Sequence, residues 1–296
     1  MRVGALAAAF DRIYSENHQN TLEHGIVALS VLGFLAHLGC IGIVRNIAHP
    51  PALVAGVGDN YLAAIYTPFS LILFYEVLLL IGAIPKSTTR SLATQYEIVS
   101  LIFIRGFFKD IAALDLEHLS HPVEDLTPAF TDIATGLVMF LLVTIFRRAS
   151  QRPVPEVSRG GLGINLERFI ERKKIVALAL TIVFVWLAVQ NLWDYGVETF
   201  QAAPGAGTSR ALFYSDVFTV MIFTDVLILL LSLLVTDRYE SVFRNAAFVV
   251  SAILIRFSLT MGHPWGELLG VIGMLFGIFT LLIFNYWTSF TTPRSA

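Results

Sequence analysis

Residues 266–287 read GELLGVIGMLFGIFTLLIFNYW, and this run decides the class of the fold. It contains one acidic residue, Glu267, and no basic residue. About 17 to 25 predominantly apolar residues in a helix cross the hydrocarbon core of a bilayer, so the run predicts a membrane-spanning helix. Further runs of this kind predict spans at 25–45, 66–84, 94–113, 128–146, 174–194, 213–235 and 243–261. We therefore expect an all-α polytopic membrane protein with eight transmembrane helices.

The composition of the whole chain agrees with this class. Of its 296 residues, 56% are hydrophobic and 14% are charged, whereas about 25% are charged in a typical soluble domain. The net charge of −2 gives no reason to expect a nucleic-acid partner. Cys40 is the only cysteine, which excludes an intrachain disulfide and a cysteine metal cage. The expected partners are the lipid bilayer and either another copy of the chain or another protein of a membrane complex.

Three motifs occur twice along the chain, in the same order. They are FYEVL at 74–78 and FTDVL at 223–227, SLIFIR at 100–105 and SAILIR at 251–256, and HPVEDL at 121–126 and HPWGEL at 263–268. The first span of each half also shares a run, IVAL, at 26–29 and 175–178. We therefore predict a duplicated four-helix unit. Because four is an even number, both repeats enter the membrane with the same orientation.

The duplication divides the chain into four parts. We expect a cytoplasmic N-terminal arm at 1–24, the first repeat at 25–150, a basic linker at 151–173 and the second repeat at 174–290. Basic residues are concentrated around the linker: Arg147, Arg148, Arg152, Arg159, Arg168, Arg172, Lys173 and Lys174. Since lysine and arginine accumulate in cytoplasmic loops, both termini are predicted to be cytoplasmic. The basic residues of the linker are expected to lie near anionic headgroups.

Charged residues inside the predicted spans are the first candidates for a functional site, because an ionisable group in hydrocarbon is costly unless it is paired or hydrated. The candidates expected near the bundle interiors are Glu76, Arg105, Asp132, Asp225 and Arg256. Residues equidistant from a helical turn lie at the same depth, at about 1.5 Å per residue. This rule places Arg256 within reach of Asp225. It leaves Arg105 roughly 8 Å beyond Glu76, with Asp132 as a competing partner, so we expect any activity in the first repeat.

These charges allow three interpretations. They neutralise one another and fix how neighbouring helices dock, they line an ion or proton pathway, or they respond to membrane voltage. One arginine per four-helix bundle makes a poor voltage sensor. Buried charges need partners whatever the function, so the first two interpretations stay open. The corresponding functions are ion or proton conduction or sensing, and a non-catalytic structural or assembly subunit of a membrane complex.

The two His-Pro motifs supply the outer-face candidates His121, Asp125, His263 and Glu267. Proline at the first helical position and acids in the first turn are typical of helix starts, so Pro122 and Pro264 predict the starts of the fourth and eighth spans. A pH-responsive role for His121 and His263 is an alternative. An outward-facing metal or proton site is another, with the potential ligands Asp115, Glu117, His118, His121 and Asp125. Their spacing matches no zinc signature, and we assign no metal site.

The sequence shows no signature of catalysis or of a cofactor. It contains no glycine-rich phosphate loop, no Ser-His-Asp spacing and no His-Glu-x-x-His motif. His37 lies in the first span without a second histidine at a matching depth, so a bis-histidine haem is not expected. We therefore predict no catalytic residue, no enzyme activity and no cofactor.

The motifs resemble those of one known family. An aromatic-acid-aliphatic run, an arginine late on the next helix, and a proline followed by an acid at the start of the fourth helix resemble the phosphate-starvation-inducible protein PsiE family. Members of that family resemble a single four-helix unit, so this chain looks like two such units fused. The second repeat is the more similar, with Asp225 where the family usually has Glu. The resemblance implies a bacterial inner-membrane protein linked to stress or phosphate limitation, and it implies no established activity.

Overall fold

A computed structural model describes residues 2–47, 60–114, 122–151, 163–201, 206–233 and 239–291, with side chains described except at 2–3, 122–125, 163–167, 191–217, 233 and 291. Within these ranges the chain forms nine α-helices and no strand. The helices are α1 (Arg2–Ile13), α2 (Glu16–Asn46), α3 (Ala63–Ala83), α4 (Thr88–Ala113), α5 (Pro122–Ser150), α6 (Gly163–Gln201), α7 (Ala206–Leu233), α8 (Tyr239–Thr260) and α9 (Trp265–Thr291).

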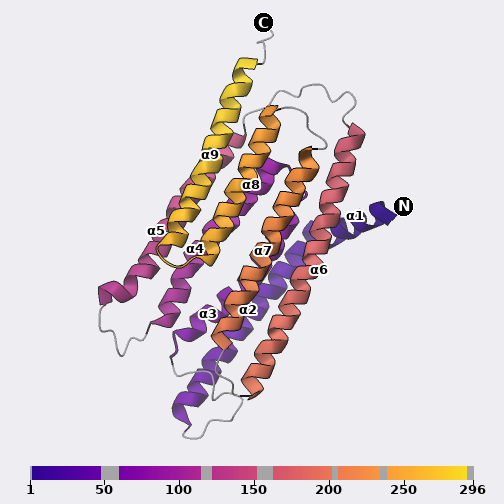
Figure 1. Cartoon of the computed structure of the whole chain (residues 1–296). Helices are drawn as coiled ribbons and strands as arrows, with labels where there is room; N and C mark the ends of the chain where they lie inside the picture. The colour runs from indigo at the N-terminus through magenta and orange to yellow at the C-terminus, as the bar shows by residue number, and fades with distance from the viewer. Residues whose placement is uncertain are drawn as a thin grey trace.

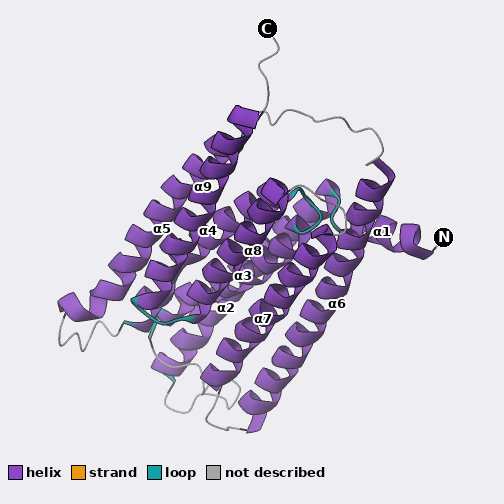
Figure 2. Ribbon diagram, turned by 45° about the horizontal axis from the view of Figure 1, so that its top comes forward, coloured by secondary structure: helices purple, strands orange, loops and turns teal. Residues whose placement is uncertain are grey.

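The long helices lie side by side in a bundle, with α5 and α9 at one edge and α6 at the opposite edge (Figures 1 and 2). Six helices of the described part are long and apolar enough to cross a membrane, which supports an all-α membrane protein. They are α2, α3, α5, α6, α8 and α9. The other two predicted spans are also helical. However, α4 carries several charges between Arg90 and Asp110, and the side chains of α7 are described only over the apolar stretch Phe218–Ser232.

The helix starts follow local chemistry. Ser87 precedes α4, and its side chain accepts a hydrogen bond from the backbone N–H of Arg90, which satisfies one of the free donors of the first turn. The start predicted at Pro122 is confirmed, because α5 begins there. The helix α9 begins directly after Pro264 and carries Glu267 in its first turn, where an acid favours the positive end of the helix dipole.

The predicted N-terminal arm is helical and is anchored to the bundle. It comprises α1 and the first residues of α2, and α1 packs against α6. The Tyr14 hydroxyl forms a hydrogen bond of 2.8 Å with Thr181. The Tyr14 ring lies where a Cβ on Gly82 of α3 would stand, so only glycine fits there. Tyr14 therefore connects the start of the chain with α3 and α6.

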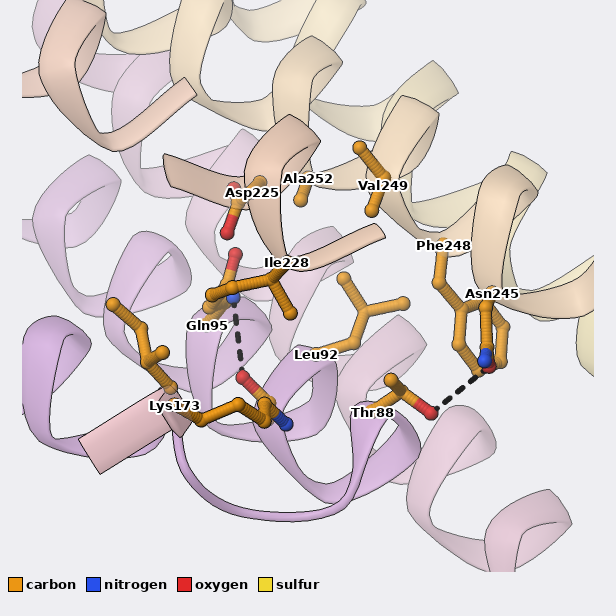
Figure 3. Close-up of a pocket in the computed structure, with 12 residues that line it drawn as sticks. Thr88, Leu92, Gln95, Lys173, Asp225, Ile228, Asn245, Phe248, Val249 and Ala252 are labelled. Atoms are coloured by element: carbon orange, nitrogen blue, oxygen red, sulfur yellow. Dashed lines mark hydrogen bonds between the residues drawn. The ribbon is translucent and has the colours of Figure 1, made fainter. Parts of the chain in front are cut away.

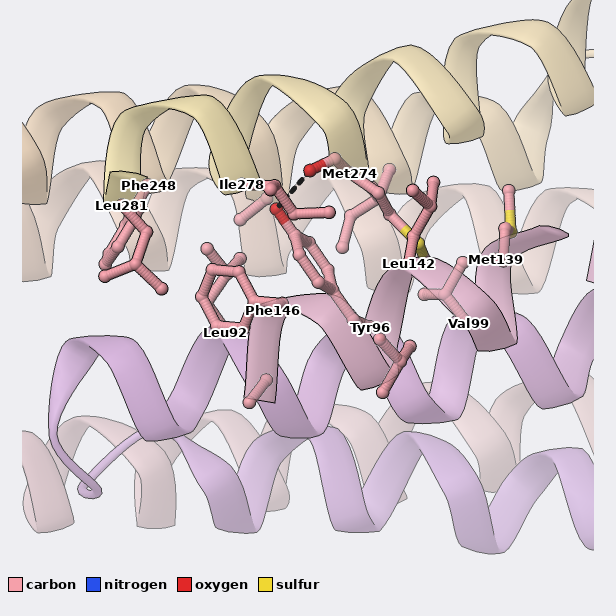
Figure 4. Close-up of a cluster of buried hydrophobic side chains, with 14 of the residues drawn as sticks. Leu92, Tyr96, Val99, Met139, Leu142, Phe146, Phe248, Met274, Ile278 and Leu281 are labelled. Carbon is pink, nitrogen blue, oxygen red and sulfur yellow. Dashed lines mark hydrogen bonds between the residues drawn. The ribbon is translucent and has the colours of Figure 1, made fainter. Parts of the chain in front are cut away.

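The main core joins the two halves of the chain. Buried apolar side chains of α4, α5, α8 and α9 form one cluster, part of which is seen in Figure 4. At its centre Tyr96 of α4 forms a hydrogen bond of 2.5 Å with Ser251 of α8. A Cβ on Gly277 of α9 would overlap the Tyr96 hydroxyl. The helix α9 can therefore pack close to α4 because a residue without a side chain faces the hydroxyl.

The outer surface of the bundle is apolar. Phe223 is 71% exposed, Leu32 65% and Phe130 64%, and many other large hydrophobic side chains of the long helices also point outward. Water makes so extensive an apolar surface unfavourable, whereas lipid tails do not. The charged candidates lie on the opposite side of these helices, toward the interior.

Candidate functional site

In the first half of the bundle, Glu76 of α3 forms an ion pair with Arg105 of α4. The Glu76 side chain is 3% exposed and that of Arg105 is 21% exposed. Both Glu76 carboxylate oxygens lack a hydrogen bond within the described residues. Of the two partners that the sequence left open for Arg105, the structure selects Glu76 over Asp132. The depth rule placed the two groups apart because it ignores helix tilt and the length of both side chains.

In the second half, Asp225 of α7 forms the corresponding ion pair with Arg256 of α8. Arg256 is also bound by neutral acceptors: its Nη2 donates to Gln95 Oε1 at 3.2 Å and its Nη1 to the Met221 carbonyl at 3.3 Å. With a relative exposure of 2%, it is among the most deeply buried side chains. The pair is therefore held from three sides, one of which is Gln95 of α4 in the first half of the chain.

Gln95 is a site residue that the sequence analysis missed. It is 4% exposed, and it lies on α4 near the start of the predicted span 94–113. The available signal was a neutral amide among apolar residues, which costs free energy in hydrocarbon unless its hydrogen bonds are satisfied. Gln95 carries no charge, so a criterion based on ionisable groups does not select it.

A cavity of about 50 Å³ borders the second ion pair. Its polar lining comes from both halves and includes Asp225, Gln95 and Lys173, which Figure 3 shows around the same space. Thr88 and Asn245 lie farther along it and are joined by a hydrogen bond of 3.2 Å. About 10–15 Å³ of such volume accommodates one water molecule. The cavity is thus large enough for a few waters next to Asp225.

Lys173, one of the basic residues that the sequence predicts to lie near the headgroups, is buried against the bundle. It is 3% exposed, and its Nζ donates a hydrogen bond of 2.8 Å to the Lys86 carbonyl in the turn between α3 and α4. The reason is that α6 begins at Gly163, so that Lys173 is already part of a helix packed against the bundle. Lys173 also lines the cavity.

The outer-face candidates divide into two groups. His263 and Glu267 lie together: His263 Nδ1 contacts a Glu267 carboxylate oxygen, and His263 Nε2 lies 3.6 Å from Asp110 Oδ2 and 3.9 Å from Asp132 Oδ1. Asp132 thus belongs to this cluster, and Asp110 joins it without having been singled out from the sequence. His121 and the loop acids Asp115 and Glu117, with His118, lie outside the described residues, as does the side chain of Asp125.

The interior therefore holds two kinds of polar group. The buried ion pairs lie between adjacent helices, α3 with α4 and α7 with α8. The histidine–carboxylate cluster lies at the end of the bundle where α8 turns into α9, and His263 there is 38% exposed.

Comparison of the chain with protein-family models, with curated proteins and with solved structures finds no match.

Proposed function

We propose that the chain spans the membrane eight times, as two four-helix repeats in parallel orientation, α2–α5 and α6–α9. The contacts between helices support this proposal. Each repeat packs its helices in chain order, and α4 packs against α8 as α5 packs against α9. These two contacts join equivalent helices of the repeats, as an approximate two-fold axis along the membrane normal would require.

The proposed location is a bacterial inner membrane with both termini in the cytoplasm. The concentration of basic residues around the linker supports this orientation. The resemblance to the PsiE family supports the location, and it suggests a role under stress or phosphate limitation.

Within this architecture, we propose that the chain conducts or senses protons or small ions through its buried acid–arginine pairs. One observation carries the proposal: Asp225, the acid of the Asp225–Arg256 pair, lines a mostly apolar cavity that Gln95 and Lys173 also line. The cavity provides a place for water beside the only group of that pair that can readily release and bind a proton.

A structural or assembly role is the alternative, and the same ion pairs give it some support. Each pair joins adjacent helices, α3 with α4 and α7 with α8, and thereby fixes how they dock. Under this alternative the carboxylates need no access to either surface. A transport measurement separates the two functions.

The experiment is proton flux in proteoliposomes that contain a pH-sensitive dye, driven by a potassium diffusion potential. We expect the wild-type chain to acidify or alkalinise the lumen faster than protein-free liposomes do. Asp225→Asn keeps the shape of the side chain and removes the proton-binding group, so flux should fall to the protein-free level. Glu76→Gln tests the first repeat in the same way.

A matched control is Glu97→Gln, because Glu97 is an acid on α4 whose partner is Arg147 and whose side chain is 31% exposed. Its flux should equal that of the wild type. If the wild type does not exceed protein-free liposomes with protons, Na⁺ or K⁺, conduction is refuted and the structural role remains. If Asp225→Asn and Glu97→Gln conduct equally well, the pathway does not use the second ion pair.

A further inference from the structure

Three side chains from three separate parts of the chain converge at one end of the bundle. Asp110 comes from the end of α4, Asp132 from α5 and His263 from the turn between α8 and α9. One ligand atom of each lies within 4.8 Å of the other two. Two ligand atoms bound to the same Zn²⁺ in tetrahedral geometry, at about 2.1 Å from the ion, are about 3.4 Å apart. The distances of 3.6 and 3.9 Å from His263 Nε2 to the two aspartates are close to that separation.

Glu267 gives the histidine its orientation. Its carboxylate contacts His263 Nδ1, so that Nε2 is directed toward the two aspartates. Histidines that bind metals almost always donate their second ring N–H to such a carboxylate or carbonyl group. Glu267 is 6% exposed and lies in the first turn of α9, where the rigid helix holds it in place.

The carboxylates of this cluster outnumber its positively charged groups. Within the described part of the chain, neither lysine nor arginine forms an ion pair with Asp110, Asp132 or Glu267, although Lys109 acts electrostatically on both aspartates. Glu267 Oε2 and Asp110 Oδ2 are buried and accept no hydrogen bond there. Carboxylates buried together in this way are costly unless a cation compensates them.

Access and space are consistent with an ion at this position. The side chains of His263 and Asp110 are 38% and 17% exposed, so the cluster is open toward the end of the bundle. Asp132 lies deeper, and its carboxylate occupies the place where a Cβ on Gly106 of α4 would stand. Glycine at that position therefore allows Asp132 to reach the cluster.

We propose that Asp110, Asp132 and His263 bind a divalent first-row metal ion of the Zn²⁺ type, with Glu267 as the positioning residue for His263. One imidazole nitrogen and two carboxylate oxygens suit Zn²⁺, whereas a site for Mg²⁺ or Ca²⁺ would consist of oxygens alone. The ion joins α4 and α5 of the first repeat to the α8–α9 turn of the second. This site does not depend on the proposed conduction, since binding and flux are measured separately.

The test is metal content of the full chain, purified in detergent on an affinity tag that contains no histidine. After removal of metal with EDTA, the protein is equilibrated with Zn²⁺, freed of excess ion and measured by mass spectrometry, and its affinity is measured by calorimetry. We expect about one Zn²⁺ per wild-type chain. Asp110→Asn, Asp132→Asn and His263→Gln should lose the bound ion, and Glu267→Gln should weaken binding about 10- to 100-fold.

His24→Gln is the matched control, because His24 is an exposed histidine on α2 whose ring bonds only to its own helix through the Asn20 carbonyl. It should bind Zn²⁺ as the wild type does. Zn²⁺ should also raise the Tm of the wild type and of His24→Gln but not of His263→Gln. His263 is partly exposed, so His263→Gln should fold even if an aspartate variant does not. Equal Zn²⁺ content in the wild type and His263→Gln, or preference for Mg²⁺ over Zn²⁺, would overturn the proposal.

Discussion

The buried Asp225–Arg256 pair allows a prediction about stability that does not depend on the function. Asp225→Asn removes one charge and leaves Arg256, at 2% exposure, without a counter-ion. Breaking a buried pair on one side costs about 3–5 kcal/mol of unfolding free energy. Arg256 keeps its bonds to Gln95 and to the Met221 carbonyl, so we expect a value near the lower end, about 3 kcal/mol.

The opposite variant, Arg256→Met, should lower the free energy of unfolding by less than Asp225→Asn does. A carboxyl group left alone can bind a proton and become neutral, whereas a guanidinium group in a protein cannot lose one. The double variant Asp225→Leu with Arg256→Met should be close to the wild type, because a buried ion pair can often be replaced by apolar side chains of similar volume. With the single variant Asp225→Leu measured as well, Asp225→Leu, Arg256→Met and the double variant form a double-mutant cycle for the pair.

The assay is reversible unfolding in mixed micelles by titration with SDS, followed by far-ultraviolet circular dichroism. Asp11→Asn is the control, since Asp11 pairs with Lys174 at the surface, where the Asp11 side chain is 57% exposed. Exposed pairs contribute about 0.2–1 kcal/mol. If Asp225→Asn costs no more than Asp11→Asn, the pair is hydrated or unformed in the membrane and the reasoning from burial is wrong.

Further predictions concern the core and the cavity. Gly277→Val should destabilise the protein by about 1–3 kcal/mol in the same unfolding assay, because the new side chain overlaps Tyr96. The control is Gly262→Ala, which has nothing near its Cβ position and should change stability by less than about 0.5 kcal/mol. Tyr96→Phe should cost about 1 kcal/mol through loss of the bond to Ser251, and a neutral result would contradict that contact. Lys173→Met should lower proton flux in proteoliposomes while the protein remains folded, because the ammonium group lines the cavity; unchanged flux would exclude this end of the cavity from the pathway.

Much of the helical structure could be predicted from the sequence, because a bilayer imposes a length on every span. The start of α5 at Pro122 follows from local chemistry in the same way. The repeated motifs also indicated which acid and arginine correspond in the two halves. These are properties of neighbouring residues along the chain, which the sequence displays directly.

Contacts between distant segments could not be predicted in the same way. The burial of Lys173 depends on where α6 begins and on the turn that it packs against. The neighbours of Asp132 depend on the crossing of α4, α5 and the α8–α9 turn. They include Asp110, which lies near the end of the predicted span 94–113 and was not singled out from the sequence. Depth along a helix specifies one coordinate, and tilt and rotation about the helix axis determine the others.

One helix contacts all three polar sites. Gln95 of α4 binds Arg256, Arg105 pairs with Glu76, and Asp110 faces His263. At about 1.5 Å per residue they extend over about 22 Å of the helix, most of the roughly 30 Å of a bilayer core. If protons move along α4, Zn²⁺ at the outer cluster lies at the mouth of their route and competes with them for His263. Zn²⁺ added on that side should then inhibit the flux of the wild type and spare that of His263→Gln. Equal inhibition of both would mean that the metal site and the pathway are separate.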